Sequence, residues 1–261
     1  MILTFLIVAI VGFAIGVVSG LLGVGGGMAM VPIFRLAFGM SAVASTATSL
    51  FAIIPTSISG AVQHVRNKTC IPKLGVALGI GGACLSPLGV WLAQVSPGWL
   101  VMVAVALVVG YSSITMFRKA IKMPKGKQLV VSDPVSLDRP ALLKAALIGA
   151  LAGVMSGYVG LGGGFLMIPL MVSLLHMPMR LASGTSLIAV MILAVPATVM
   201  QCIIGNVDYL AGVAIVCGTV PGALVGARLV KRIPERALRF TFAAFLSVAA
   251  VLLVAKELGA M

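Results

Sequence analysis

Two short glycine-rich stretches could bind an anion without any charged side chain. The first is SGLLGVGGGMAMVP, which begins at Ser19, and the second is SGYVGLGGGFLMIP, which begins at Ser156. Glycine weakens a helix by about 1 kcal/mol relative to alanine, so each triplet predicts a helix break followed by a new helix. The free N–H groups and the positive dipole end at such a helix start attract anions. The alternative is that the glycines only allow close helix packing. The triplets are Gly25, Gly26 and Gly27, and Gly162, Gly163 and Gly164.

Hydroxyl side chains form a second matched feature. The sequence Thr-Ser-Leu occurs at residues 48–50 and again at 185–187, each time near the start of a long apolar segment. Neutral donors suit an oxyanion that must be held and then released, but the same groups equally serve as helix caps or bonds between helices. Gln63 and Gln201, near the ends of the same two segments, are further candidates. The hydroxyl candidates are Thr46, Thr48, Ser49, Ser183, Thr185 and Ser186.

Other residues that could do chemistry are sparse. The five acidic residues all fall in loops or at segment ends, so no carboxylate lies within an apolar run. This removes the usual proton relay of membrane proteins and catalysis by paired carboxylates. His64 and His176 are isolated, and the four cysteines show no C-x-x-C spacing. We therefore expect no catalytic residue, no metal site and no cofactor.

The composition indicates a membrane protein. Hydrophobic residues make up 61% of the 261 residues and charged residues 9%, with a mean hydropathy of +1.22. So few charged side chains could not cover a soluble domain of this length. Several runs approach the roughly 20 residues that cross a bilayer as a helix. The expected fold class is an all-α polytopic membrane protein surrounded by the lipid bilayer. The first run lacks a basic start and a cleavage site, so we interpret it as a retained span.

The sequence also contains an internal repeat. The second glycine-rich stretch begins 137 residues after the first, with eight of fourteen positions identical, and about four extra residues are needed near Pro196 to keep the later segments aligned. The expected organisation is a first repeat at 1–117, a basic linker at 118–140 and a second repeat at 141–261. The second segment of each repeat is too short to cross alone, and whether it is re-entrant or tilted is left open. The expected helical segments are 2–22, 28–38, 42–64, 72–95 and 98–117, then 141–159, 165–176, 181–204, 208–229 and 236–255.

The basic residues predict how the repeats are oriented. Placing the linker in the cytoplasm puts sixteen of the eighteen Lys and Arg residues on that side and leaves Arg35 and Lys256 outside. Equivalent loops, at 66–73 and 205–208, then have opposite charge bias, as inverted repeats should. We expect two inverted repeats of five segments each, with both termini outside. The net charge of +13 thus serves topology, and no nucleic-acid partner is expected.

The glycine-rich pair, together with ATSL, GTSL and GALVGARLVKRIP, resembles the signature of the sulfite exporter TauE/SafE family of bacterial membrane permeases. The resemblance covers nearly the whole chain. It implies a multi-pass protein of the bacterial cytoplasmic (inner) membrane that moves sulfur-containing oxyanions or sulfonates. CLSP at residues 84–87 departs from its counterpart VPGA in the second repeat.

Three functions are weighed on these features. The first is a secondary transporter of a small sulfur-containing anion, exporting it and binding it near the midplane between the two helix breaks. The second is a passive anion channel with the same site. The third is a membrane enzyme or an assembly factor for sulfur metabolism, which should show clustered Cys, His or carboxylates. The substrate, transport direction, coupling ion and oligomeric state, including a homodimer, are left open.

Overall fold

The computed structural model describes residues 2–97, 100, 110, 113–115, 117, 118, 120, 121 and 138–258. The elements of these ranges are helices, which confirms the expected all-α fold. Their bounds lie within three residues of the expected ones, and the expected segment 98–117 falls largely outside the described residues. The helices are α1 (Ile2–Leu22), α2 (Gly27–Ala37), α3 (Ala42–Arg66), α4 (Pro72–Val95), α6 (Arg139–Val159), α7 (Gly164–Leu174), α8 (Met179–Ile204), α9 (Tyr209–Leu229) and α10 (Glu235–Leu258).

The helix lengths fit a multi-pass membrane protein. Within the described ranges, α3, α4, α6, α8 and α9 are long and apolar enough to cross a bilayer. By contrast, α2 and α7 have 11 residues each, so each rises only about 16 Å. Both short helices begin at the last glycine of a triplet, one residue before the expected starts at 28 and 165.

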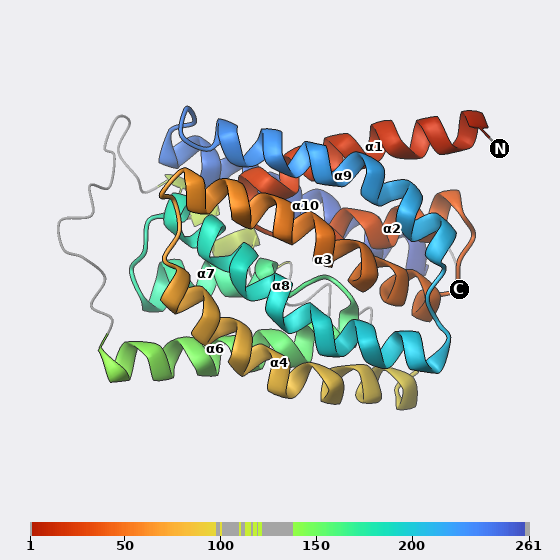
Figure 1. The fold of residues 1–261 in the computed structure, drawn as a ribbon, viewed down its shortest axis with the longest axis horizontal. Helices are drawn as coiled ribbons and strands as arrows, with labels where there is room; N and C mark the ends of the chain where they lie inside the picture. The colour runs from red at the N-terminus through yellow and green to blue at the C-terminus, as the bar shows by residue number, and fades with distance from the viewer. Residues whose placement is uncertain are drawn as a thin grey trace.

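The long helices pair in a reciprocal pattern. Helix α1 packs along α9, α4 packs along α6, and α3 and α8 pack together between these two pairs. Figure 1 shows the resulting layers, with α1 and α9 at one edge, α3 and α8 in the middle, and α4 and α6 at the other edge. The short helices pack in matching ways within their own halves, with α2 on α3 and α7 on α8. Each outer pair therefore joins a helix of the first half to a helix of the second.

Small residues make these outer pairs close. On α1 the glycines recur every four residues, at Gly12, Gly16 and Gly20, and a Cβ atom at any of them would strike the backbone of α9. On α6 the same spacing places Gly149, Gly153 and Gly157 against the backbone of α4. Small residues four apart let helix backbones approach closely in lipid. Close helix packing thus involves glycines outside the triplets as well.

The chain direction places equivalent loops at opposite ends of the bundle. In Figure 1 the α3–α4 connection lies at the left end, and the α8–α9 connection lies at the right end. The start of α1 and the end of α10 both lie at the right. These positions support the inverted arrangement, which stays a prediction together with its side of the membrane.

Most of the described basic residues gather where α3, α9 and α10 meet the start of α8. One buried acid organises this end. The Glu235 carboxylate accepts the backbone N–H of Met179 at 2.5 Å and pairs with Arg239 at 3.2 Å. Its place at the first turn of α8 complements the positive end of that helix. The Arg180 guanidinium donates to the carbonyl of Ile233 at 2.9 Å, which ties the same start to the α9–α10 connection.

Candidate functional site

Each short helix has an N-cap position whose backbone conformation favours glycine. The N-cap residues are Gly26 (φ 86°) for α2 and Gly163 (φ 69°) for α7. Both are left-handed, a conformation that costs other residues about 1–2 kcal/mol. Matching residues of the two breaks share this conformation, because Gly23 and Gly25 have positive φ, as do Gly160 and Gly162. The two breaks therefore have the same backbone shape.

The structure brings the two breaks into contact. A Cβ atom added at Gly164 would lie 2.6 Å from the carbonyl oxygen of Gly23 in the first break. One added at Gly27 would lie 3.0 Å from the carbonyl of Leu161 in the second break. Each triplet ends in glycine because the other break occupies the space a side chain would need. The two helix starts thus meet inside the bundle, and a single site shared by both stays a prediction.

These starts leave backbone donors without a helical partner. The N–H groups of Ala29 and Leu166 bond back to the N-cap carbonyls, at 3.1 Å each. Among the described residues, no backbone or side-chain acceptor is assigned to the N–H groups of Gly27, Met28 and Phe165. First-turn N–H groups lack partners within any helix, and with the helix dipole they attract anions.

Two of the predicted hydroxyls hold the breaks in shape. Ser49 on α3 donates to the carbonyl of Gly160 at 3.1 Å. The hydroxyl oxygen of Ser186, its counterpart on α8, lies 2.7 Å from the carbonyl of Gly23 and 2.8 Å from the carbonyl of Ser183, so its one hydrogen is shared between two acceptors. Each break is therefore fixed by a serine of the other half, and we call Ser49 and Ser186 the clamp serines. Both side chains are fully buried.

The other predicted hydroxyls are also engaged with the backbone. Thr48 accepts the N–H of Asp208, and Thr185 accepts the N–H of Ile71, each at 3.0 Å. These are again matching contacts between one half and a loop of the other. Thr46 and Ser183 donate to carbonyls of their own helices, at 2.8 and 3.0 Å. The structure thus favours the interhelical and capping interpretation for these groups, and their contact with a ligand stays a prediction.

The two predicted glutamines lie at the C-terminal ends of α3 and α8. Gln63 donates to Asn67 at 3.2 Å and accepts from Arg228 at 3.3 Å. Gln201 accepts from Asn206 at 2.9 Å. Both amides are bound to helix-end neighbours, and neither appears among the nearest contacts of the breaks. Their role in binding stays untested.

The sequence reasoning missed a second set of buried hydroxyls. The described residues that share a buried hydroxyl oxygen without a hydrogen-bond partner, at most 5% exposed, are Ser19, Ser45, Ser57, Ser156 and Thr198. We call them the unpartnered hydroxyls. Ser45 stands apart, because its counterpart in the second repeat is Ala182. Ser19 and Ser156 open the two repeated stretches, and Ser57 and Thr198 each lie two residues after the helix prolines Pro55 and Pro196. Their repetition in both halves was the available signal.

His64 was also missed as a structural residue. Its Nε2 donates to the carbonyl of Gly20 at 2.9 Å, and its Nδ1 lies 2.8 Å from the hydroxyl oxygen of Thr69. The ring therefore ties the end of α3 to α1 just before the first break. Near it, burial raises the pKa of the Cys70 thiol, so this cysteine is a poor nucleophile. No three His, Cys, Asp or Glu residues within the described ranges are grouped as metal ligands would be.

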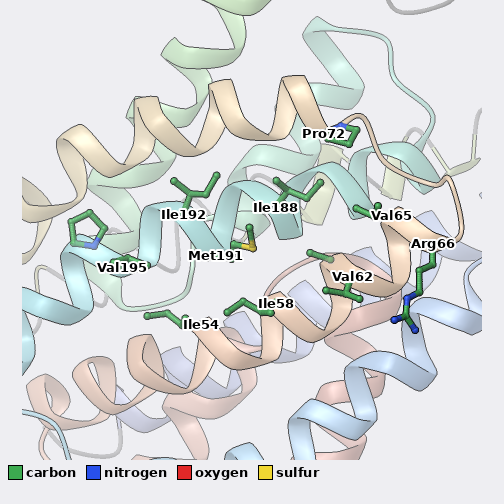
Figure 2. Close-up of a pocket in the computed structure, with 12 residues that line it drawn as sticks. Ile54, Ile58, Val62, Val65, Arg66, Pro72, Ile188, Met191, Ile192 and Val195 are labelled. Carbon is green, nitrogen blue, oxygen red and sulfur yellow. The ribbon is translucent and has the colours of Figure 1, made fainter.

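The breaks are sealed from the surface, whereas an open apolar groove lies beside them. Residues 19–28 and 159–165 are all buried. The groove has a volume of about 940 Å³ and runs between α3 and α8 (Figure 2), lined by side chains such as Ile58, Val62 and Ile192, with Arg66 at one end. This lining offers an anion almost no donors, so the groove suits lipid chains rather than a solute. The polar candidate site is the buried contact of the two breaks.

The fold and the breaks together define a multi-pass helical membrane protein with two discontinuous helices meeting in its interior. The chain matches the family described as "Sulfite exporter TauE/SafE" over residues 8–253. It therefore belongs to the sulfite exporter TauE/SafE family, and its class is that of a membrane transporter.

Named relatives agree with this class. The chain is 29% identical over 235 residues to the "Probable membrane transporter protein YdhB" of Bacillus subtilis (strain 168), covering 90% of this chain and 94% of that protein. It is 26% identical over 250 residues to YunE of the same organism, which has the same description, covering 90% and 91%. It is 28% identical over 169 residues to MJ0441 of Methanocaldococcus jannaschii, covering 62% and 59%. No solved structure matches the chain.

Proposed function

We propose that this chain is a secondary transporter of small sulfur-containing oxyanions or sulfonates, and that it exports them. The solute binds at the starts of α2 and α7 in a form of the protein in which the two breaks have moved apart, because here they are in direct contact. The observation that supports this is the contact between the breaks, at which Gly164 lies against Gly23 and Gly27 against Leu161. Paired discontinuous helices at matching positions are the arrangement that places substrate sites in many transporters. The family description, a sulfite exporter, supports the choice of sulfur oxyanions.

The chemistry of the breaks suits an anion that must leave again. The nearest neighbours of the first triplet are uncharged, so no fixed cation would trap the solute. Backbone N–H groups and helix dipoles supply partial positive charge in a low-dielectric interior, where their effect is largest. Those neighbours include Val190, Ser57, Ile53, Met30 and Ser19.

The burial of the breaks fits a carrier better than a permanently open channel. A carrier passes through a form in which its site is closed to both sides, and the breaks here are buried throughout. The reciprocal pairs α1–α9 and α4–α6 could move as two units against α3 and α8, and so open the site to either end. The proposal requires this motion and assigns no catalytic step to the protein.

The membrane potential favours export. With the cytoplasm negative, each negative charge that leaves gains about 2.3 kcal/mol per 100 mV. The proposed orientation places the basic end of the bundle in the cytoplasm of a bacterial inner membrane, following the positive-inside rule. Both termini then lie outside. No coupling ion is needed for downhill export, which is consistent with the lack of carboxylates in the apolar runs.

Transport in proteoliposomes tests the proposal. The full chain is reconstituted, loaded with radiolabelled sulfite or methanesulfonate, and given an imposed interior-negative potential. We expect saturable efflux that accelerates when unlabelled substrate is added outside, because a carrier exchanges solutes. A Gly26→Leu variant should be inactive, and protein-free liposomes give the background. Linear efflux without exchange would indicate a channel, and efflux equal to background for every sulfur anion would overturn the proposal.

Orientation can be tested separately by cysteine labelling. In a variant whose four native cysteines are replaced, Lys68→Cys in the α3–α4 connection and Asn206→Cys in the α8–α9 connection are introduced singly. An impermeant maleimide added to intact cells should label residue 206 and spare residue 68 until the membrane is opened. The reverse pattern would place the basic end outside, and equal labelling would contradict the inverted arrangement.

A further inference from the structure

Ser19 and Ser57 face the first break and lack any protein partner. A Cβ atom placed on Gly26 would lie 3.5 Å from the Ser19 hydroxyl oxygen, and one placed on Gly25 would lie 3.2 Å from the Ser57 hydroxyl oxygen. Both side chains are buried, at 2% and 0% exposed. The free N–H groups at the start of α2 and the two buried hydroxyls therefore lie close together at the first break.

Buried hydroxyls without partners are uncommon, because removing such a group from water is costly unless a hydrogen bond replaces the lost ones. Among the described residues, four of the five unpartnered hydroxyls lie at matching positions of the two repeats, and Ser45 is the exception. Ser156 is the counterpart of Ser19 in the second break, and its Cβ would lie 3.5 Å from a Cβ on Gly163. It is fully buried and also has no partner. Chance packing does not explain why matching serines beside both helix starts share this state.

We propose that Ser19, Ser57 and Ser156 are substrate-binding residues that donate hydrogen bonds to the oxygens of a monovalent oxyanion held between the starts of α2 and α7. This inference rests on the transporter function proposed above and names the donors and the charge of its substrate. The donors come from three helices, with Ser19 on α1, Ser57 on α3 and Ser156 on α6. An anion with three oxygens, such as a sulfonate or hydrogen sulfite, carries enough acceptor sites for these hydroxyls and for the N–H groups of Gly27 and Met28.

The neutral neighbours of the two breaks determine which charge the bound anion should carry. The nearest neighbours of Gly25, Gly26, Gly162 and Gly163 are apolar or neutral. The cost of moving an ion out of water rises with the square of its charge, so a divalent anion costs about four times as much as a monovalent one of the same size. The same neutral donors therefore offset a larger share of the cost for the monovalent anion. The site should bind methanesulfonate more tightly than sulfate.

Binding to the purified full chain in detergent tests this inference, with methanesulfonate and sulfate as probes. Ser19→Ala and Ser57→Ala should each weaken methanesulfonate binding about tenfold or more, because a hydrogen bond to a charged group is lost. Without ligand, their unfolding temperatures should equal or exceed that of the wild type, because no protein hydrogen bond is removed.

Ser59→Ala provides the matched control on the same helix. Ser59 donates to the carbonyl of Val220 at 2.7 Å, so this variant should unfold at a lower temperature yet bind methanesulfonate like the wild type. The two kinds of serine are thus separated by opposite readouts. Because Ser19 and Ser57 lie on different helices, either variant answers the question if the other fails to fold.

The outcomes separate this inference from the proposed function. If the wild type binds methanesulfonate and both alanine variants bind it equally well, the serines are not ligands, although the transporter function stands. If sulfate binds as tightly as methanesulfonate, the monovalent selectivity is wrong. If the wild type binds neither probe nor sulfite, the proposed function and this inference both fail.

Discussion

The clamp serines and the unpartnered hydroxyls are the same chemical group put to different uses a few ångströms apart. Ser49 donates to the Gly160 carbonyl of the opposite break, and Ser186 donates to the Gly23 carbonyl in competition with the Ser183 carbonyl. Both hydroxyls are therefore bonded to backbone. Ser19 and Ser57 point at the first break without any such bond. The comparison teaches that burial and residue type do not distinguish a structural hydroxyl from one with an unused donor, whereas the hydrogen-bond partner does.

Replacing a glycine whose carbonyl is bound by a clamp serine should have the largest effect on stability. In Gly23→Ala the new Cβ would meet the hydroxyl oxygen of Ser186 at 2.6 Å and also the backbone of Ser183, at a residue whose φ is +78°. Left-handed strain and overpacking together predict a loss of about 2–5 kcal/mol in the free energy of unfolding. Denaturant unfolding in detergent measures it.

Gly205→Ala is the control for this prediction. Gly205 has φ +85° but no atom within 4 Å of an added Cβ, so only the backbone strain of about 1–2 kcal/mol remains. Equal losses at residues 23 and 205 would show that the clamp contributes nothing beyond the turn itself.

Removing the clamp serines should come next. Ser49→Ala and Ser186→Ala each leave a buried carbonyl without its donor, which costs about 1–2 kcal/mol per residue. The same unfolding measurement applied to Ser19→Ala serves as reference, because that variant loses no bond. A clamp variant as stable as the Ser19 variant would erase the distinction between the two sets.

The threonine contacts should have a smaller and unequal effect. Thr185→Val removes the acceptor of the partly buried Ile71 N–H, whereas Thr48→Val removes the acceptor of Asp208, which is exposed and can bond to water instead. We expect about 1 kcal/mol for Thr185→Val and less for Thr48→Val. Hydrogen exchange of the two N–H groups would report the same order directly, and a larger loss at Thr48 would contradict it.

The smallest effect is expected where a hydroxyl bonds only to its own helix. Thr46→Val and Ser183→Ala remove bonds to carbonyls three residues earlier. Such local bonds compete with the helix rather than support it, so the unfolding free energy should change by less than about 0.5 kcal/mol. If these variants lose as much stability as the clamp variants, the effect does not depend on whether the hydroxyl is bonded to its own helix or to the opposite break.

The fold was accessible from the sequence because its signals are local. Apolar length predicts the spanning helices, and a triplet such as Gly25–Gly27 ends one helix and begins another within a few residues. The bounds of α2 and α7 follow from these signals. The expected segment 98–117 and the linker lie largely outside the described residues.

The candidate site was accessible only in part, because hydrogen-bond partners depend on long-range packing. Thr48 and Ser49 were found through their repetition, yet their partners Asp208 and Gly160 lie more than 100 residues away in the chain. Ser19 stands first in the repeated stretch and was passed over, since nothing in the sequence shows that its hydroxyl is unpartnered. Ser57 and Thr198 were obscured by the extra residues near Pro196.

The exchange of clamps between the halves also constrains how the protein is made. During synthesis the first break enters the bilayer long before Ser186 leaves the ribosome, and until then the Gly23 carbonyl has no serine to bind. The second break meets its clamp at once, because Ser49 is already in place. Biogenesis should therefore be vectorial, with the amino-terminal break maturing last although it is made first, and a chain truncated before α8 should remain a substrate for membrane quality-control proteases.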